Sequence, residues 1–198
     1  MLNKRIGLAL IAVIFLAAGL WAQTFQVDPV HSSVGFTIRH IVSNVKGRFT
    51  DFSGTIVYDP KKIENSSVTV SIKAATIDTD NQKRDDHLRS PDFFDVEKFP
   101  EITFQSAKVA KKGNKFILHG TLVMHGIEKK VSIPFEILGT AKDPGGNNRA
   151  GFEAELTLNR KDFGIIWNRT LDQGGLLLGE DVKISLSLEA VEATEKKG

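Results

Sequence analysis

The sequence predicts an all-β domain, either an up-and-down barrel or a two-sheet sandwich, on three observations. Apolar and polar residues alternate with period 2 along most of the chain, as expected for half-buried strands. Several of these segments are longer than most strands, which favours the tilted strands of a barrel. One polar segment near the middle of the chain lacks the alternation and favours a short helix.

The alternation marks eight strands, preceded by a short extended segment at 24–27. The last strand is the clearest, because Val182, Ile184 and Leu186 alternate with polar neighbours. Turn sequences separate several strands, and the strongest of them lies at 143–147. The predicted strands span 32–42, 45–58, 66–78, 101–110, 115–124, 128–141, 148–160 and 179–191.

Pro134 lies inside the sixth predicted strand and cannot donate a backbone hydrogen bond to a neighbouring strand. We therefore expect a bulge or a local gap there, and incomplete closure of a barrel at that point. A closed barrel of eight strands has room for one small ligand. Alternation looks the same around a cavity and around a filled core, so it does not distinguish the two.

The helical segment is predicted between the third and fourth strands, from Asp80 to Ser90, with Asp80 as its N-cap and Pro91 as its stop. Two adjacent aromatic residues, Phe93 and Phe94, follow in a polar setting. The whole insertion is long for a connection between strands, and long connections in compact domains often cover a binding site.

Residues 1–22 are predicted to be a secretory signal. Lys4 and Arg5 precede an uncharged apolar run that ends in small residues, so we expect cleavage after Ala22. The alternative is an uncleaved anchor helix, for which the run is at the lower limit of length. Cleavage would leave residues 23–198 as one domain in the periplasm or outside the cell.

The charge balance shows no excess of basic residues of the kind that binds nucleic acid. Two of the 26 basic residues and none of the 24 acidic residues lie in the signal, so the remaining chain is formally neutral. The chain has no cysteine, which excludes disulfides and a lipidated cysteine at the cleavage site.

Three polar clusters could carry chemistry. The segment 28–33 holds an acid, a histidine and hydroxyls, but it is better interpreted as a turn that leads into the first long strand. His87 could bind a metal or move a proton with Asp85 or Asp86, although neighbours on a helix do not share a face. Arg160 could pair with Asp162 or meet an anionic headgroup at a barrel mouth.

The chain resembles the YceI-like proteins, a lipid- or polyisoprenoid-binding family. The resemblance runs from about Phe25 to Ala190 and includes many collinear matches. The matching segments are 28–36 with His40, 47–49, 84–95, 99–104, 120–122 with His125 and Gly126, and 160–164. The segment 84–95, RDDHLRSPDFFD, is the most specific.

The resemblance implies an eight-stranded antiparallel lipocalin-like barrel with a short helical insertion. It also implies an apolar channel for a polyisoprenoid or a related lipid and a periplasmic or secreted location. The family offers no agreed catalytic residues, so none is assigned. The ligand could be a polyisoprenoid, a quinone-like lipid or a fatty-acyl lipid, and no cofactor, metal or nucleic acid is expected. A homodimer and transient membrane contact are left open.

The alternation predicts which side chains point into a barrel, although each can equally be plain core. The predicted ligand-facing residues are Phe36, Ile38, Ile56, Val70, Ile72, Phe104, Leu118, Leu122, Phe135, Leu156, Ile184 and Leu186. The predicted residues of the cavity entrance or cover are His87, Arg89, Phe93, Phe94 and Arg160.

The sequence therefore favours an exported protein that encloses an apolar ligand for storage or transport. A first alternative is an enzyme that acts on a bound lipid through an acid–base site formed by His87, Asp86 and His31, which requires two of these groups to meet in a cavity. A second alternative is a stress or structural protein without a ligand, whose interior would be filled by side chains.

Overall fold

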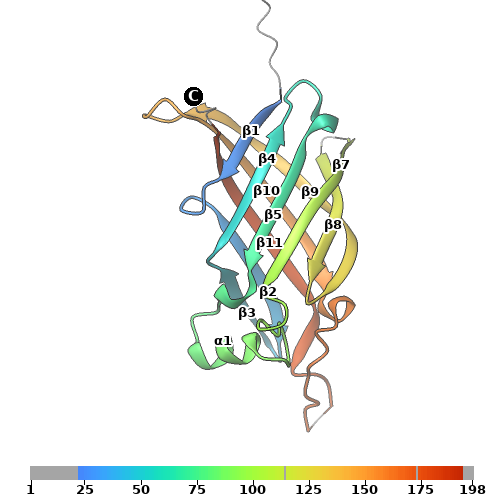
Figure 1. The fold of residues 1–198 in the computed structure, drawn as a ribbon. Coiled ribbons are helices and arrows are strands. Elements are labelled where there is room, and N and C mark those ends of the chain that lie inside the picture. The colour runs from blue at the N-terminus through green and yellow to red at the C-terminus, as the bar shows by residue number, and fades with distance from the viewer. Residues whose placement is uncertain (1–21, 114, 173, 194–198) are drawn as a thin grey trace, which may run out of the picture.

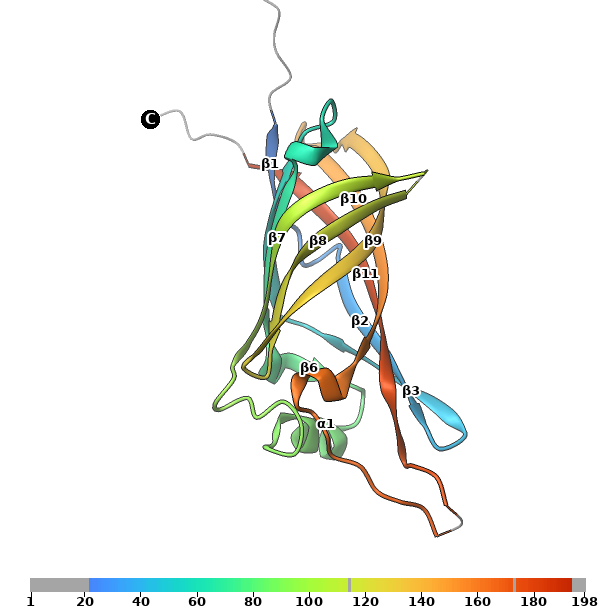
Figure 2. The same ribbon diagram turned by 90° about the vertical axis from the view of Figure 1, so that its right-hand side faces the viewer.

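The computed structural model describes residues 22–113, 115–172 and 174–193, in which antiparallel strands form a closed barrel (Figures 1 and 2). The predicted signal lies outside this range, apart from Ala22. The ring closes because β1 pairs with β4 on one side and with β11 on the other. In order around the ring, the strands are β1 (Gln23–Val27), β4 (Phe52–Tyr58), β5 (Ser67–Lys73), β7 (Glu101–Lys112), β8 (Lys115–Met124), β9 (Ile127–Lys142), β10 (Asn148–Asn159) and β11 (Leu178–Glu192).

Three further strands extend the first three strands of the ring toward one end of the molecule. They are β2 (Ser33–His40), β3 (Ser43–Phe49) and β6 (Ile77–Asp78). β2 pairs with the first half of β11 and with β3, and β3 pairs with β6. Seven of the eight predicted strands therefore contribute to the ring, and the short segment predicted at 24–27 supplies its eighth strand, β1. The strand predicted at 32–42 is β2, which extends the ring, and those predicted at 45–58 and 66–78 are each broken in two.

The two breaks lie beside each other. The first is at Thr50 and Asp51, and the second is the 3₁₀ turn η2 (Ala74–Thr76). The Thr50 amide donates to the Thr76 carbonyl at 3.3 Å, and the Lys73 amide donates to the Asp51 carbonyl at 3.0 Å. These bonds satisfy backbone groups that leave the regular ladder, and they let β3 and β6 diverge from β4 and β5.

The predicted helix is present as α1 (Gln82–Arg89), but its cap was assigned wrongly. The side chain of Asn81, not that of Asp80, accepts a hydrogen bond from the Arg84 amide at 3.0 Å. Asp80 instead adopts a left-handed conformation with φ of 57°, which an acidic residue tolerates in a turn. The helix lies across one end of the barrel (Figure 1), called here the α1 end.

The gap expected at Pro134 is present. Pairing between β9 and β10 ends at Phe135 and Ala154, so the ladder between these strands covers only one half of the barrel wall. A depression of about 440 Å³ lies over the unpaired part, lined by residues of both strands and of the 3₁₀ turn η3 (Arg160–Phe163). Proline ends the ladder because it has no amide hydrogen for β10.

Side chains pack tightly where β1 joins the ring. Phe25 and Ala190 are fully buried there, and Tyr58 meets Phe152 edge to face at 6.0 Å. A second buried cluster lies between β7, β8 and β9, around Val109. Within the described ranges, no helix has both the length and the apolar character needed to cross a bilayer.

Candidate ligand-binding cavity

Two adjoining cavities occupy the barrel. The larger, of about 650 Å³, lies at the α1 end, and we call it the lower cavity. The smaller, of about 180 Å³, lies inside the ring, and we call it the upper cavity. Both are walled in part by Phe49, Met124, Leu158 and Ile184, so they meet at these side chains.

All twelve residues that alternation placed in the barrel interior line one of these cavities. Phe36 and Ile38 line the lower cavity, Ile184 lines both, and the other nine line the upper one. Some of them also belong to the packed core, since Ile56, Phe104 and Leu118 are buried. Their placement inside the barrel is thus established, while their contact with a ligand stays a prediction.

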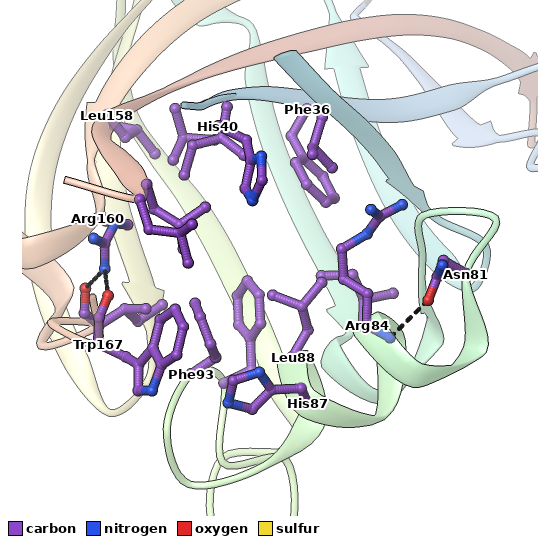
Figure 3. Close-up of a pocket in the computed structure, with 18 of the residues that line it drawn as sticks. Phe36, His40, Asn81, Arg84, His87, Leu88, Phe93, Leu158, Arg160 and Trp167 are labelled. Carbon is purple, nitrogen blue, oxygen red and sulfur yellow. Dashed lines mark hydrogen bonds between the residues drawn. The ribbon is translucent and has the colours of Figure 1, made fainter. Parts of the chain in front are cut away.

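A cluster of aromatic rings covers the lower cavity. His87 of α1 meets Phe93 and Trp167 edge to face, with ring centroids 5.0 and 4.9 Å apart, and Phe93 lies 5.2 Å from Trp167 (Figure 3). Phe94 packs edge to face on Phe49 at 5.8 Å. His87, Phe93 and Phe94 line the cavity, and their part in the entry of a ligand stays a prediction.

The cover comes from two segments far apart in the sequence. One is α1 with the residues up to Phe94. The other is the η3–β11 connection, described at residues 164–172 and 174–177, which supplies Trp167 and Leu177 to the lower cavity. Sequence reasoning missed Trp167 because the connection has no periodic pattern that would place its side chains.

Arg89, predicted at the entrance or cover, belongs to α1 but does not line the cavity itself. Its guanidinium donates to the carbonyls of Ala75 and Ile77 at 2.7 and 3.0 Å and to the Asp86 carboxylate at 2.9 Å. These bonds fasten α1 to η2 and β6. Arg89 therefore holds the cover in place from outside.

A second anchor fixes the start of α1. The buried carboxylate of Asp85 accepts hydrogen bonds from the amide and the hydroxyl of Thr79. Arg84 donates to the hydroxyl and the carbonyl of Thr79, both at 2.7 Å. Charge-assisted bonds of this kind are stronger than neutral ones, so the helix is held firmly across the barrel end.

Arg160 organises the η3–β11 connection. Its Nη1 donates to the carbonyls of Ile165 and Trp167 at 2.7 and 2.8 Å, and its Nε donates to that of Gly179 at 2.9 Å (Figure 3). The side chain is 96% buried, and this burial lowers the pKa of Arg160, partly opposed by the charge of Glu180. Arg160 lines the cavity as predicted but does not pair with Asp162.

The polar lining of the lower cavity is entirely basic or neutral. Among the described residues, no aspartate or glutamate lines it, and the acidic residues of α1 face elsewhere. Lys83, Arg84 and Arg160 bring cationic groups to this lining, which favours a ligand group that accepts hydrogen bonds or carries negative charge. The basic side chains that line it are His40, Lys83, Arg84, His87 and Arg160.

The acid–base site considered from the sequence is not assembled. His87 pairs with Asp92 at 2.8 Å, and Asp86 pairs with Arg89. His31 pairs with Asp28 at 2.9 Å, in the turn between β1 and β2, and lines neither cavity. None of the three groups is within hydrogen-bond reach of another, which removes the geometry that general acid–base catalysis requires.

The turn at 28–33 belongs to an ion cluster that the sequence did not reveal. Asp28 accepts from the Val30 amide, as the predicted turn requires. Asp28, His31 and Glu189 offer ligand atoms within 4.8 Å of one another, the spacing of a metal site. The guanidinium of Arg149, however, donates to both Asp28 and Glu189, so a cation from the chain already pairs with these carboxylates.

The fold and the cavity define a class: a lipocalin-like antiparallel β-barrel with an apolar interior and a helical cover at one end. A family model of the YceI-like domain matches residues 25–190, and the chain belongs to this family. A UPF0312 protein of Photorhabdus laumondii is 40% identical over 167 residues, covering 82% of this chain and 87% of that protein. Protein YceI of Salmonella arizonae is 35% identical over 195 residues, covering 97% and 99%.

Solved structures share the architecture. The crystal structure of BcnA from Burkholderia cenocepacia matches with a TM-score of 0.74 and 25% identity, over 85% of this chain and 99% of that one. A polyisoprenoid binding domain from Saccharophagus degradans matches with a TM-score of 0.66 over 87% and 99%. Its identity is only 13%, so that match shows the fold alone.

Proposed function

We propose that this protein is an exported carrier that encloses one long apolar ligand in the two adjoining cavities. The observation that supports this best is the continuity of the cavities, which meet at Phe49, Met124, Leu158 and Ile184. Together they form an apolar channel from the α1 end into the ring. The cavities weigh against the alternative of a ligand-free protein with a filled interior.

Burial of an apolar chain can supply the affinity without catalytic groups. Each buried methylene contributes about 0.8 kcal/mol. A ligand of about twenty apolar carbons therefore gains roughly 16 kcal/mol, which exceeds most estimates of the ~4–15 kcal/mol cost of association. A lower cavity of about 650 Å³ is also within the usual size of a ligand site.

The distribution of charge sets the orientation of the ligand. The lower cavity is lined by basic groups such as Lys83 and Arg84, whereas the only charged residue lining the upper cavity in the described ranges is Glu153. A polar or acidic headgroup is therefore better solvated at the α1 end, with the tail in the ring. A polyisoprenoid, a quinone-like lipid or a fatty acid all have this shape, and a domain that shares this fold is described as polyisoprenoid binding.

Native mass spectrometry of protein isolated from its own host tests the carrier function. We expect a population with an added mass that organic solvent removes and that fragments as a lipid. The proposal would be overturned if the native spectrum shows only the mass of the polypeptide and the protein takes up no polyisoprenoid, fatty acid or quinone from vesicles.

Export is a separate part of the proposal, and it depends on residues 1–22. Fractionation of host cells followed by sequencing of the mature N-terminus tests it. We expect the protein in the periplasm or the medium, with Gln23 at its N-terminus. A cytoplasmic protein that retains Lys4 and Arg5 would contradict export without affecting lipid binding.

A further inference from the structure

Exposed apolar side chains gather at the α1 end of the barrel. Among the described residues, six large hydrophobic side chains are exposed, and four of them belong to two segments at this end. These segments are the tip of the β2–β3 hairpin and the η3–β11 connection (Figures 1 and 2). The four residues are Ile41, Val42, Ile166 and Leu176.

The two segments are in direct contact, so their exposed apolar residues lie at the same end of the barrel. The Ile41 amide donates to the Leu177 carbonyl at 3.0 Å. Val42 beside it is 83% exposed, and Ile166 is 68% exposed. No other part of the described chain covers these side chains, which leaves them in water in the isolated protein.

The residues at the hairpin tip make the folded state of the free protein less stable than the usual turn residues would. His40 and Ser43 are paired, so Ile41 and Val42 form a two-residue turn, in which Asn-Gly or Gly-X is strongly preferred. Ile41 has a φ of 46°, a left-handed conformation that a β-branched residue adopts at a cost in free energy. Two exposed apolar residues at such a turn worsen both the backbone energy and the solvation of the free protein.

The β2–β3 hairpin that carries this apolar tip is basic. Residues 33–49, which form β2, β3 and their turn, contain Arg39, Lys46 and Arg48 and no aspartate or glutamate. Arg48 pairs with Asp78 and Asp80, whereas Arg39 and Lys46 are exposed and have no ion pair within the described ranges. Apolar side chains beside unpaired cations match the chemistry of an anionic lipid bilayer.

The same hairpin leads into the lower cavity. Behind the exposed tip, Ile38 pairs with Val45 across the two strands, and both line the cavity together with Phe36. Leu177, which bonds to the tip through its carbonyl, also lines it. On the cavity side of the hairpin, only the His40–Ser43 pair lies between the apolar tip and the Ile38–Val45 pair, and both of these polar residues also line the cavity.

We propose that the α1 end is a membrane-docking face, in which Ile41, Val42, Ile166 and Leu176 insert into an anionic bilayer. The face rests on the proposed carrier function, because it places the mouth of the lower cavity against the membrane. A lipid then passes between bilayer and barrel along the β2–β3 hairpin without crossing water. Arg39 and Lys46 meet the lipid headgroups.

Vesicle flotation tests the docking face on protein recovered from the soluble fraction of its host, with mass spectrometry confirming which N-terminus it carries. The vesicles are phosphatidylcholine alone or phosphatidylcholine with about one third phosphatidylglycerol. We expect binding to the anionic vesicles that weakens at high salt. The double variant Val42→Asp, Ile166→Asp should bind at least tenfold more weakly.

The chain offers a matched control. Val30 is 84% exposed, like Val42, and Leu138 is 60% exposed, but both lie away from the α1 end. The double variant Val30→Asp, Leu138→Asp should bind vesicles like the unmodified protein, and circular dichroism should show that both doubles fold. Equal binding by the two doubles, or no binding by the unmodified protein, would overturn the docking face.

Two further outcomes separate this inference from the carrier function. If the protein contains lipid but does not bind vesicles, the carrier function stands and the docking face is wrong. If light scattering shows a dimer that Val42→Asp converts to a monomer, with no vesicle binding, the face joins two copies of the chain instead. Slower lipid transfer from anionic vesicles to the docking-face variant, with unchanged capacity at equilibrium, supports the inference directly.

Discussion

His87 of α1 and Trp167 of the η3–β11 connection meet edge to face, with ring centroids 4.9 Å apart. This contact joins the two segments that cover the lower cavity. Since each segment is anchored separately, through Arg89 on one side and Arg160 on the other, the ring contact is where the cover can part. The strength of this contact should therefore control how fast a ligand leaves.

Replacing Trp167 with alanine should speed ligand release. Edge-to-face aromatic pairs contribute about 0.5–1.5 kcal/mol beyond their burial, and Trp167 also contacts Phe93. We expect the dissociation rate to rise about tenfold, measured by transfer of a loaded lipid to empty vesicles. Trp167→Phe retains an aromatic ring and serves as the control, with a smaller rise. Equal rates for the alanine variant and the unmodified protein would show that the cover does not limit release.

Trp167 also offers a direct signal. The chain has two tryptophans, and the other one, Trp21, lies in the predicted signal. After cleavage, the intrinsic fluorescence reports Trp167 alone. We expect a saturable change in its emission as a lipid fills the lower cavity, and none when a soluble headgroup without its tail is added.

Ile184→Trp should shorten the channel. Ile184 lines both cavities, so a larger side chain there blocks their junction. A ligand that spans both cavities should bind at least tenfold more weakly, a loss of about 1.4 kcal/mol, while a short ligand confined to the lower cavity keeps its affinity. Ser187→Trp adds the same ring on the exposed side of β11 and should change neither affinity. Equal losses for short and long ligands would contradict a continuous channel.

Gly120→Ala should destabilise the barrel wall. A Cβ at Gly120 would lie 2.4 Å from Cζ of Phe104 and 2.5 Å from the backbone carbonyl oxygen of Gln105. The backbone of Gln105 is held in the sheet and cannot move away without a cost in free energy, so we expect the free energy of unfolding in urea to fall by about 1–3 kcal/mol. Gly151→Ala is the control, because its nearest neighbour is Leu138 at 3.4 Å, an ordinary contact. If both variants unfold at the same urea concentration, the barrel wall accommodates a Cβ at position 120 without loss of stability.

The interior of the barrel was predictable because alternation is a local signal. A strand residue and its second neighbour share a face whatever the rest of the fold does, so Phe36, Ile38 and Leu186 could be placed inside from the sequence. The same rule contained evidence for the first of the two breaks. Phe49 and Phe52 are both buried but three residues apart, which a continuous strand does not allow.

The cover and the ion cluster were only partly predictable because they depend on contacts between distant segments. The motif at 84–95 identified His87, Phe93 and Phe94, but nothing near Trp167 indicated that it would meet them. The bonds of Arg89 to Ala75 and Ile77 were not predictable, because its position in the motif does not reveal which way its side chain leaves the helix. Arg149 was missed because it lies far in sequence from Asp28.

Arg149 binds three carboxylates and joins β10 to the β1–β2 turn and to β11. Its guanidinium contacts Asp28 and Asp143 at 2.9 Å and also binds Glu189. Removing the positive charge while keeping much of the volume, as in Arg149→Met, leaves three neighbouring carboxylates uncompensated. We expect the melting temperature to fall, with partial recovery when Asp28→Asn is added, because that removes one of the unpaired charges.

This cluster should also make stability depend on acidity. Hydrogen bonds from His31 and Arg149 lower the pKa of Asp28 from its usual 3.8 to about 2, and bonds from Asn147 and Arg149 hold the pKa of Asp143 below its usual range. A depressed pKa means that the unfolded chain binds protons more readily than the folded one. The stabilisation is therefore complete above about pH 4 and is lost as the pH falls toward 2.

Urea denaturation across this interval should show a declining free energy of unfolding, and Asp28→Asn should flatten part of that decline. Asp172→Asn, at an exposed position of the η3–β11 connection, is the control and should leave the slope unchanged. If the free energy of unfolding falls as steeply with pH in Asp28→Asn as in the unmodified protein, the hydrogen bonds of Asp28 do not lower its pKa in the folded protein.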